Sequence, residues 1–277
     1  MAAEKKKAKI IVLTGQSNAV GVGYIKHLPD HFSEAKVKEF NDGYANVLMN
    51  FYSHDFGSDG FVNVKPGLAE STKATLGPEV GIAEKLTEDF PNETFYIVKY
   101  AIGGSTLYHD WLSKTSREKE GDNPRGDKQT GYCYDGFVEL LRKSIKILED
   151  KGLTPEIRAF CWMQGESDAF EQADVDNYIV RFNDLIEDFE KEFKPYLKDY
   201  ILVDGGISPF WKYYNEINEL KKEYAKKGKR RVFIDTIKEG LRTDREPVEN
   251  PDPPHYDSDS VIKLGNLFEN AIKENLK

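Results

Sequence analysis

The feature that most constrains the fold is an alternation of short β-branched apolar runs with longer amphipathic stretches. The short runs predict strands over residues 9–14, 37–40, 94–101, 156–163, 200–204 and 231–234. Apolar residues at helical spacing predict helices over 78–90, 137–148, 174–193 and 213–227, and from residue 258 onward. Strand–helix alternation is typical of a parallel sheet with helices on both faces.

Three stretches lack this periodicity and are expected to be loops. Residues 41–76 form an irregular stretch that indicates a functional loop or lid, and the polar stretch 113–129 indicates an exposed loop. A proline-rich loop over 240–256 precedes the last helix, for which Asp257 is the expected N-cap. No internal repeat and no shift in composition divides the chain, so we expect one domain over residues 1–277.

Charge excludes several classes of partner. The chain carries 39 Lys and Arg against 48 Asp and Glu, a net charge of −9. This balance argues against a nucleic-acid or anionic-membrane partner, because phosphate contacts need clustered basic residues. No apolar run approaches the ~18 residues of a membrane span, and no signal peptide is visible. We expect a cytoplasmic protein, or a secreted one whose leader has been removed; the oligomeric state is not predicted.

The two cysteines, Cys133 and Cys161, do not form a zinc or redox motif. Cys161 lies in an apolar run and is expected to be a packed thiol. A disulfide between the two remains open at this stage.

Polar groups follow three of the expected strands, and such ends meet at one edge of a parallel sheet. Ser17 follows the first strand, where an enzyme would place a nucleophile, although Ser17 and Asn18 could equally be turn residues. Gly103 and Gly104 follow a later strand and could present bare N–H donors to an oxyanion, each worth ~3 kcal/mol. A tight turn would explain them as well.

The string Trp162-Met163-Gln164-Gly165-Glu166-Ser167-Asp168 follows the strand over 156–163. Its Gln amide could add an oxyanion donor, and its carboxylates add negative charge at the same edge. Only one of the five histidines, His255, stands in an Asp-x-x-His pattern, with Asp252 as its partner. Histidine suits a general base near neutrality, and a carboxylate on Nδ1 fixes its tautomer.

Taken together, these blocks resemble the SGNH hydrolases, and the form Gly-Gln-Ser-Asn with Trp-x-Gln-Gly-Glu-x-Asp resembles the acetylxylan esterase and sialate O-acetylesterase branch. The resemblance spans Gly15 to Gly265 in family order and includes Leu76-Gly77-Pro78-Glu79. It implies a three-layer, flavodoxin-like α/β fold with a mostly parallel sheet of about five strands. The wider superfamily usually has Asn where this branch has Gln164.

The resemblance further implies a serine esterase that needs no metal or cofactor and removes acetyl groups from acetylated sugars. His255 would deprotonate Ser17, with Asp252 as the first choice for its orienting carboxylate and Glu166 as the second. The implied oxyanion donors are the N–H groups of Ser17 and Gly104 and the amide of Gln164.

Substrate contacts are expected from Gln16 and Asn18 and from loop aromatics, with Trp111 and Trp211 favoured among Tyr24, Tyr108, Trp111, Phe210, Trp211 and Tyr256. An acidic surface fits a neutral, acetylxylan-type sugar better than sialic acid. Two alternatives stay open: a hydrolase of lipid or acyl-thioester, and a sugar-binding protein without catalysis.

Overall fold

The computed structural model describes residues 6–121 and 128–277. Its main sheet has eight strands in the order β10-β9-β8-β1-β7-β3-β4, with β5 paired to β3. These strands are β1 (Lys7–Gly15), β3 (Tyr44–Ser53), β4 (Phe56–Gly57), β5 (Val62–Val64), β7 (Phe95–Ala101), β8 (Thr154–Met163), β9 (Leu197–Gly205) and β10 (Arg231–Ile234). A separate antiparallel ribbon joins β2 (Gly23–Tyr24) to β6 (Thr75–Leu76).

The main sheet is mostly parallel, as predicted, but it has more strands than the expected five. β3, β7, β1, β8, β9 and β10 run parallel, whereas the short β4 and β5 lie antiparallel to β3. If the six parallel strands are numbered 1 to 6 along the chain, they lie across the sheet in the order 2-3-1-4-5-6. This differs from the flavodoxin-like order 2-1-3-4-5. The α/β architecture is therefore confirmed, and the strand count is corrected.

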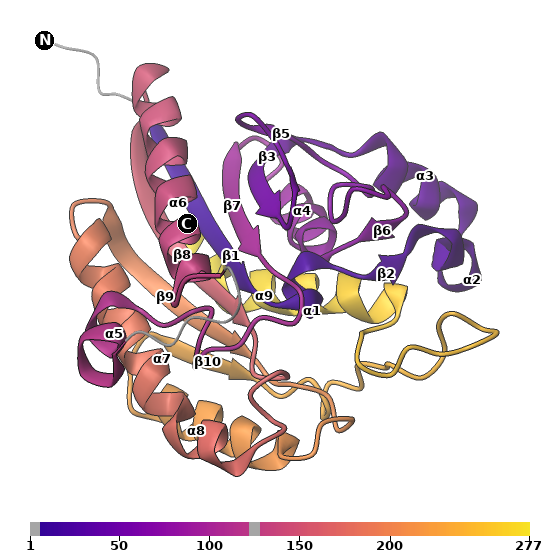
Figure 1. Cartoon of the computed structure of the whole chain (residues 1–277). Helices are drawn as coiled ribbons and strands as arrows, with labels where there is room; N and C mark the ends of the chain where they lie inside the picture. The colour runs from indigo at the N-terminus through magenta and orange to yellow at the C-terminus, as the bar shows by residue number, and fades with distance from the viewer. Residues whose placement is uncertain (1–5, 122–127) are drawn as a thin grey trace, which may run out of the picture.

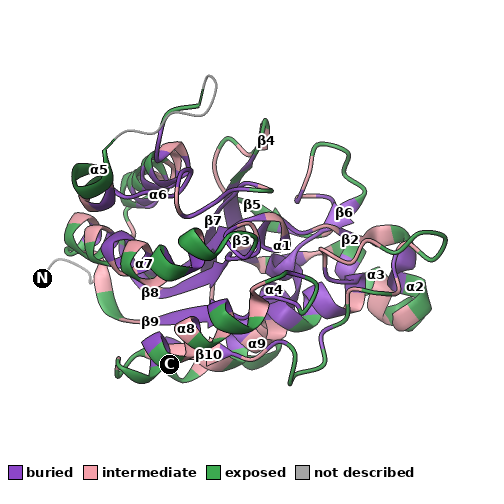
Figure 2. Cartoon of the chain, turned by 60° about the horizontal axis from the view of Figure 1, so that its bottom comes forward, coloured by how far each residue is buried: buried purple, intermediate pink, exposed green. Residues whose placement is uncertain are grey.

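Helices cover both faces of this sheet (Figure 1). The helical segments are α1 (Ser17–Val20), η1 (Ile25–His27), α2 (Leu28–His31), α3 (Glu34–Asp42), α4 (Pro78–Asp89), α5 (Lys114–Glu120), α6 (Tyr132–Asp150), α7 (Gln172–Phe193), α8 (Tyr214–Lys226) and α9 (Ser258–Leu276). α4 and α9 pack together on one face, while α6, α7 and α8 cover the other. Figure 2 shows the strands between these layers as mostly buried.

The predicted strand over residues 37–40 is wrong, because these residues lie in α3. Ser33 caps that helix by accepting the Lys36 N–H, and Phe40 is its buried residue. The second parallel strand is β3, which lies inside the stretch expected to be irregular. Its apolar run is interrupted by Asn50, which is buried and donates to Ser144 Oγ at 2.9 Å. A polar residue in a buried strand hides the strand pattern.

Part of the exposed loop expected over 113–129 is helical. Ser113 accepts the Ser116 N–H and caps α5, whereas residues 122–127 of that prediction lie outside the described residues. The other long helices match their predictions within a few residues, and Asp257 occupies the N-cap of α9. Cys133 and Cys161 are both buried free thiols, which answers the question of a disulfide. In the described part of the chain, none of the helices combines the length and apolar character that a membrane span requires.

The neighbouring strands β1 and β8 create the switch point of the sheet. From β1 the chain continues to β3 and β7 on one side, and from β8 it continues to β9 and β10 on the other. A crevice at the carboxyl ends of two such strands is where open α/β sheets bind their ligands. Ser17 follows β1 directly, and the Gln164–Asp168 segment follows β8, so the fold brings these two predicted blocks together.

Candidate active site

Ser17 is held at the mouth of this crevice by a tight connection out of β1. Gly15 has φ +143°, and a Cβ there would lie 1.9 Å from Met163 O, so only glycine allows the two strands to approach this closely. Gln16 N–H then donates to Met163 O at 2.9 Å, and Ser17 begins α1. Ser17 is half-buried, and its Oγ makes no hydrogen bond to any described residue.

His255 and Asp252 form a hydrogen-bonded pair in the loop before α9. Asp252 Oδ2 lies 2.6 Å from His255 Nδ1, and His255 N–H donates to Asp252 O at 2.9 Å. The two prolines between them close this turn with few accessible conformations. Because Nδ1 is engaged by the carboxylate, Nε2 is the nitrogen that remains for chemistry.

Asn18 joins the serine turn to the histidine loop. Its Nδ2 donates to Pro254 O at 3.3 Å, and its Oδ1 accepts the Tyr256 N–H at 3.0 Å. The residues on both sides of His255 are therefore bonded to the residue that follows Ser17. Ser17 Oγ and His255 are not hydrogen-bonded to each other in the described part of the chain.

The role predicted for Asn18, contact with substrate, does not fit this arrangement. Asn18 is 1% exposed, and both polar atoms of its side chain bond to protein; Nδ2 also donates to Glu166 Oε1 at 2.8 Å. Gln16 is also buried, and its side chain is bonded to protein: Oε1 accepts the Ser167 N–H, and Nε2 donates to Ser167 Oγ. Both residues brace the loops around the serine instead of facing a ligand.

Glu166 accepts the hydrogen bond from Asn18 Nδ2 and makes no hydrogen bond to His255 among the described residues. It is fully buried, and its second oxygen, Oε2, makes no hydrogen bond. Burial raises the pKa of Glu166, while the Asn18 hydrogen bond and the positive charges of Lys221 and His255 oppose that rise. Between the two candidate carboxylates, Asp252 is the one that touches the imidazole.

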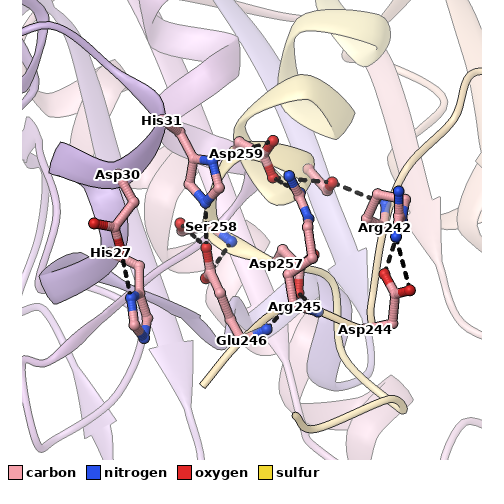
Figure 3. Close-up of polar contacts among 11 residues, drawn as sticks. His27, Asp30, His31, Arg242, Asp244, Arg245, Glu246, Asp257, Ser258 and Asp259 are labelled. Atoms are coloured by element: carbon pink, nitrogen blue, oxygen red, sulfur yellow. Dashed lines mark hydrogen bonds and ion pairs between the residues drawn. The ribbon is translucent and has the colours of Figure 1, made fainter. Parts of the chain in front are cut away.

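A cluster of ionic contacts anchors the base of the histidine loop (Figure 3). Glu246 accepts from Ser258 N–H and Oγ, each at 2.8 Å, and lies 2.6 Å from His31 Nε2. Arg245 donates to Asp257 and Asp259 at the start of α9. Glu246 O also accepts the N–H of Asp252 at 2.9 Å, so the cluster connects directly to the backbone of Asp252.

Gly103 and Gly104 form a turn beside Ser17. Ser105 N–H donates to Ile102 O at 3.3 Å, and Gly104 has φ +70°, the pattern of a type II turn with glycine at its third position. Ile102 N–H donates to Gly15 O at 3.1 Å, which draws the turn toward the serine. The N–H groups of Ser17 and Gly104 have no hydrogen-bond partner among the described residues, which leaves both available to an oxyanion.

Gln164, the third predicted oxyanion donor, is already committed to protein contacts. It is fully buried, and its Nε2 lies 2.5 Å from Asp168 Oδ2, 3.2 Å from Ser105 O and 3.3 Å from Gln16 Oε1. An amide has two protons, so none remains for a ligand. For this reason Gln164 is left out of the oxyanion donors proposed below.

Asp168 in turn fixes the segment that follows the glycine turn. Its carboxylate accepts the N–H groups of Leu107 and Tyr108. Burial raises the pKa of Asp168 to about 7, against the stabilising effect of the Leu107 N–H and the Gln164 amide. Gln164 and Asp168 are thus bonded to the turn and the segment that follow β7.

The two tryptophans expected to stack on a sugar differ in position. Trp111 is fully buried against Trp162 and donates from Nε1 to Ser105 Oγ at 2.8 Å, so it has no free face for a ligand. Trp211 is 9% exposed and packs edge-to-face on Phe170 and Phe210, which are 51% and 50% exposed. The exposed aromatic surface after β8 and β9 belongs to the two phenylalanines.

A buried ion pair that sequence reasoning missed supports the end of α1. Lys99 and Glu79 are fully buried, with Nζ 2.7 Å from Glu79 Oε2 and 2.6 Å from Val20 O. Burial lowers the pKa of Lys99, and the Glu79 carboxylate opposes that shift. A charged residue inside the apolar run over 94–101 was the available signal. Among the described residues, no group of three His, Cys, Asp or Glu side chains is placed to hold a metal ion.

With this geometry established, comparison with known families decides the broader assignment. The model of the carbohydrate esterase family described as sialic acid-specific acetylesterase matches residues 7–274. The chain belongs to this family. It is accordingly a carboxylic ester hydrolase, an esterase that removes acetyl groups from carbohydrates. No curated protein sequence matches this acetylesterase.

Solved structures similar to the acetylesterase support the fold. A protein of Arabidopsis thaliana aligns over 98% of this chain and 100% of its own, with 19% identity and a TM-score of 0.68. NanS aligns over 98% of each chain, with 20% identity and a TM-score of 0.68. XAC1771 of Xanthomonas citri, a carbohydrate acetylesterase, aligns over 96% of this chain and 56% of its own, with 12% identity and a TM-score of 0.58.

Proposed function

We propose that this esterase cleaves acetyl groups from O-acetylated, neutral sugars through an acyl-enzyme on Ser17, with His255 as base and Asp252 as its orienting carboxylate. The observation that carries the proposal is Asn18, which bonds to both flanks of His255 while adjoining Ser17. The 2.6 Å contact between His255 Nδ1 and Asp252 Oδ2 supports the assigned tautomer.

In the proposed reaction, His255 Nε2 takes the Ser17 Oγ proton as Oγ attacks the acetyl carbonyl carbon. The resulting oxyanion accepts hydrogen bonds from the N–H groups of Ser17 and Gly104, each worth about 3 kcal/mol of transition-state stabilisation. The imidazolium then protonates the departing sugar oxygen, and acetyl-Ser17 remains. A water molecule deprotonated by His255 attacks this ester, the bond from the acyl carbon to Oγ breaks, and the imidazolium returns its proton to Ser17 Oγ as acetate leaves.

The preference for a neutral sugar is supported by the charges near the loops. Sialic acid carries a carboxylate, which an unpaired Arg would recognise. Arg245 is bonded to Asp257 and Asp259, and Arg242 is bonded to Asp244 at 2.7 Å. The half-exposed rings of Phe170 and Phe210 offer an apolar surface that suits a sugar face.

The competing candidate is a sialate O-acetylesterase, which the description of the matching family favours. The test is acetate release from acetylated xylo-oligosaccharides and from O-acetylated sialic acid at equal acetyl concentration, with Ser17→Ala as the blank. We expect a higher kcat/KM on the xylo-oligosaccharides. A higher kcat/KM on O-acetylated sialic acid would make sialic acid the preferred substrate, and the proposed mechanism would still apply.

Ester chain length tests the lipid-hydrolase alternative. A series of p-nitrophenyl esters from acetate to octanoate is expected to give the highest kcat/KM for acetate. A maximum at a long acyl chain would contradict the proposal and favour a lipid ester. Binding of the oligosaccharide with no acetate released would favour the sugar-binding alternative.

A further inference from the structure

His54 is a backbone outlier outside the residues discussed so far. It occupies the two-residue turn between β3 and β4, where Ser53 pairs with Phe56. Its φ is +50°, in the left-handed region that L-residues other than Asn, Asp and His rarely adopt. Turns of this kind favour glycine or asparagine at such a position. The side chain is exposed, so core packing does not account for the histidine.

The imidazole of His54 reaches across to the glycine turn beside the serine. Its Nε2 accepts the Gly103 N–H at 3.1 Å. A Cβ on Gly103 would lie 3.1 Å from His54 Nε2 and 3.8 Å from Ser17 Cβ, so the three residues are neighbours. Accepting at Nε2 requires the neutral tautomer with its proton on Nδ1.

The glycine turn gains a restraint from this contact. Ile102 N–H donates to Gly15 O, and Ser105 Oγ donates to Ile102 O at 2.7 Å, which fixes the start of the turn. His54 accepts the N–H of the peptide between Ile102 and Gly103, whereas the next peptide, between Gly103 and Gly104, makes no hydrogen bond to the described residues. Two consecutive glycines leave many backbone conformations accessible. Fixing the first peptide therefore narrows the range of directions open to the Gly104 N–H.

We propose that His54 is a positioning residue that, by accepting the Gly103 N–H, holds the glycine turn with the Gly104 N–H directed at the oxyanion of the ester reaction. The inference rests on the function proposed above. It requires that losing the His54 acceptor lowers kcat, because the oxyanion exists only in the transition state. KM should change little, because the ground-state carbonyl depends less on that donor.

Four variants separate this role from a structural one. His54→Gly and His54→Asn suit a left-handed backbone but lack an acceptor at the Nε2 position, whereas His54→Gln can place Oε1 there. Asp55→Asn alters the other turn residue and serves as the matched control. On p-nitrophenyl acetate we expect kcat to fall about 10-fold in the Gly and Asn variants and about 3-fold or less in Gln. The melting temperature should be unchanged in all four.

Equal kcat for wild type and His54→Gly would overturn the inference. So would a higher kcat in His54→Gly, which would mean that the imidazole competes for the oxyanion donors. If the melting temperature of the Asn variant fell together with its kcat, loss of structure would explain the lower activity. His54 would then be a structural residue and not a positioning residue.

A second readout does not depend on the esterase activity. NMR relaxation dispersion of the Gly104 amide should report exchange in His54→Gly and His54→Asn, but not in wild type or His54→Gln. Identical Gly104 dispersion in all variants contradicts the inference even if the enzyme proves inert on this ester. Inactive wild type with variant-specific exchange would instead reject the proposed function and retain the role of His54 in holding the turn.

Discussion

His255 Nδ1 lies 2.6 Å from Asp252 Oδ2, within one turn of the chain closed by two prolines. The other acidic candidate, Glu166, directs its Oε1 to Asn18 Nδ2 at 2.8 Å. The two carboxylates therefore have separate structural tasks: Asp252 contacts the imidazole, and Glu166 supports the residue that ties the histidine loop to the serine turn.

Paired carboxamide substitutions test this division. Asp252→Asn should lower kcat by about 10²- to 10⁴-fold, because the imidazole loses the partner that fixes its tautomer and stabilises its cation. Glu166→Gln retains an acceptor for Asn18 and should lower kcat by about 10-fold at most. Steady-state hydrolysis of p-nitrophenyl acetate by the two variants measures the difference. The reverse ranking would make Glu166 the orienting carboxylate.

Asn18 provides a test of the tether itself. Asn18→Ala removes contacts to Pro254, Tyr256 and Glu166, and it leaves a buried carboxylate without its hydrogen bond. We expect the free energy of unfolding to fall by about 2 kcal/mol and kcat to fall at least about 10-fold. Asn177→Ala on the exposed face of α7 is the control. Urea unfolding measures the stability of both variants, and hydrolysis of p-nitrophenyl acetate measures kcat. Unchanged kcat in Asn18→Ala would show that the histidine loop needs no tether.

A buried carboxylate far from the serine predicts a pH-dependent stability. Glu269 on α9 is fully buried, both of its carboxylate oxygens lack hydrogen bonds, and burial together with the negative charge of Asp89 raises its pKa to about 7. In the unfolded chain its pKa is about 4.3. As pH rises from about 4.3 to 7, the unfolded state releases this proton while the folded state keeps it, so stability falls through that window.

Glu269→Gln removes this dependence. The variant should exceed wild type in free energy of unfolding by about 3 to 4 kcal/mol at pH 8 and by almost nothing near pH 4. Glu274→Gln, on the exposed side of the same helix, should show no such trend. Urea titrations at the two pH values give the comparison. A constant difference across pH would mean that Glu269 is ionised in the folded protein at both values.

The exposed phenylalanines predict how the sugar is held. Phe170→Ala and Phe210→Ala should each raise KM for acetylated xylo-oligosaccharides about 3- to 10-fold, since stacking on an aromatic ring is worth about 1 kcal/mol. The change in KM for p-nitrophenyl acetate should be smaller, because that ester carries no sugar. Equal changes for both substrates would indicate a damaged site and not a lost sugar contact.

The sequence was informative where a local pattern carries the structure. The runs over 156–163 and 231–234 correspond to β8 (Thr154–Met163) and β10 (Arg231–Ile234), and residues 174–193 lie in α7 (Gln172–Phe193). α7 buries one face at helical spacing, whereas β8 is buried along almost its whole length and therefore reads as a continuous apolar run. Both signals are local in the sequence. β3 escaped because Asn50 interrupts its apolar run, and its acceptor Ser144 lies 94 residues away.

Residue roles in the site could not be predicted in the same way. Gln164 and Asn18 stand in blocks that resemble the family pattern, and Trp111 was expected to be a loop aromatic. The side chains of all three are buried and bonded to other parts of the protein. Burial depends on which loops meet at the sheet edge, and one sequence does not give this. His54 stands in a hairpin turn with no motif around it, so only the contact with Gly103 reveals it.

The measurement that bears most directly on the central claim is p-nitrophenyl acetate hydrolysis by wild type, Ser17→Ala and His255→Ala, each shown to be folded by circular dichroism. The account predicts turnover by wild type and a loss of at least about 10³-fold in kcat in each variant. Turnover by Ser17→Ala at the wild-type rate would contradict the assignment of Ser17 as the nucleophile and, with it, the proposed acyl-enzyme mechanism.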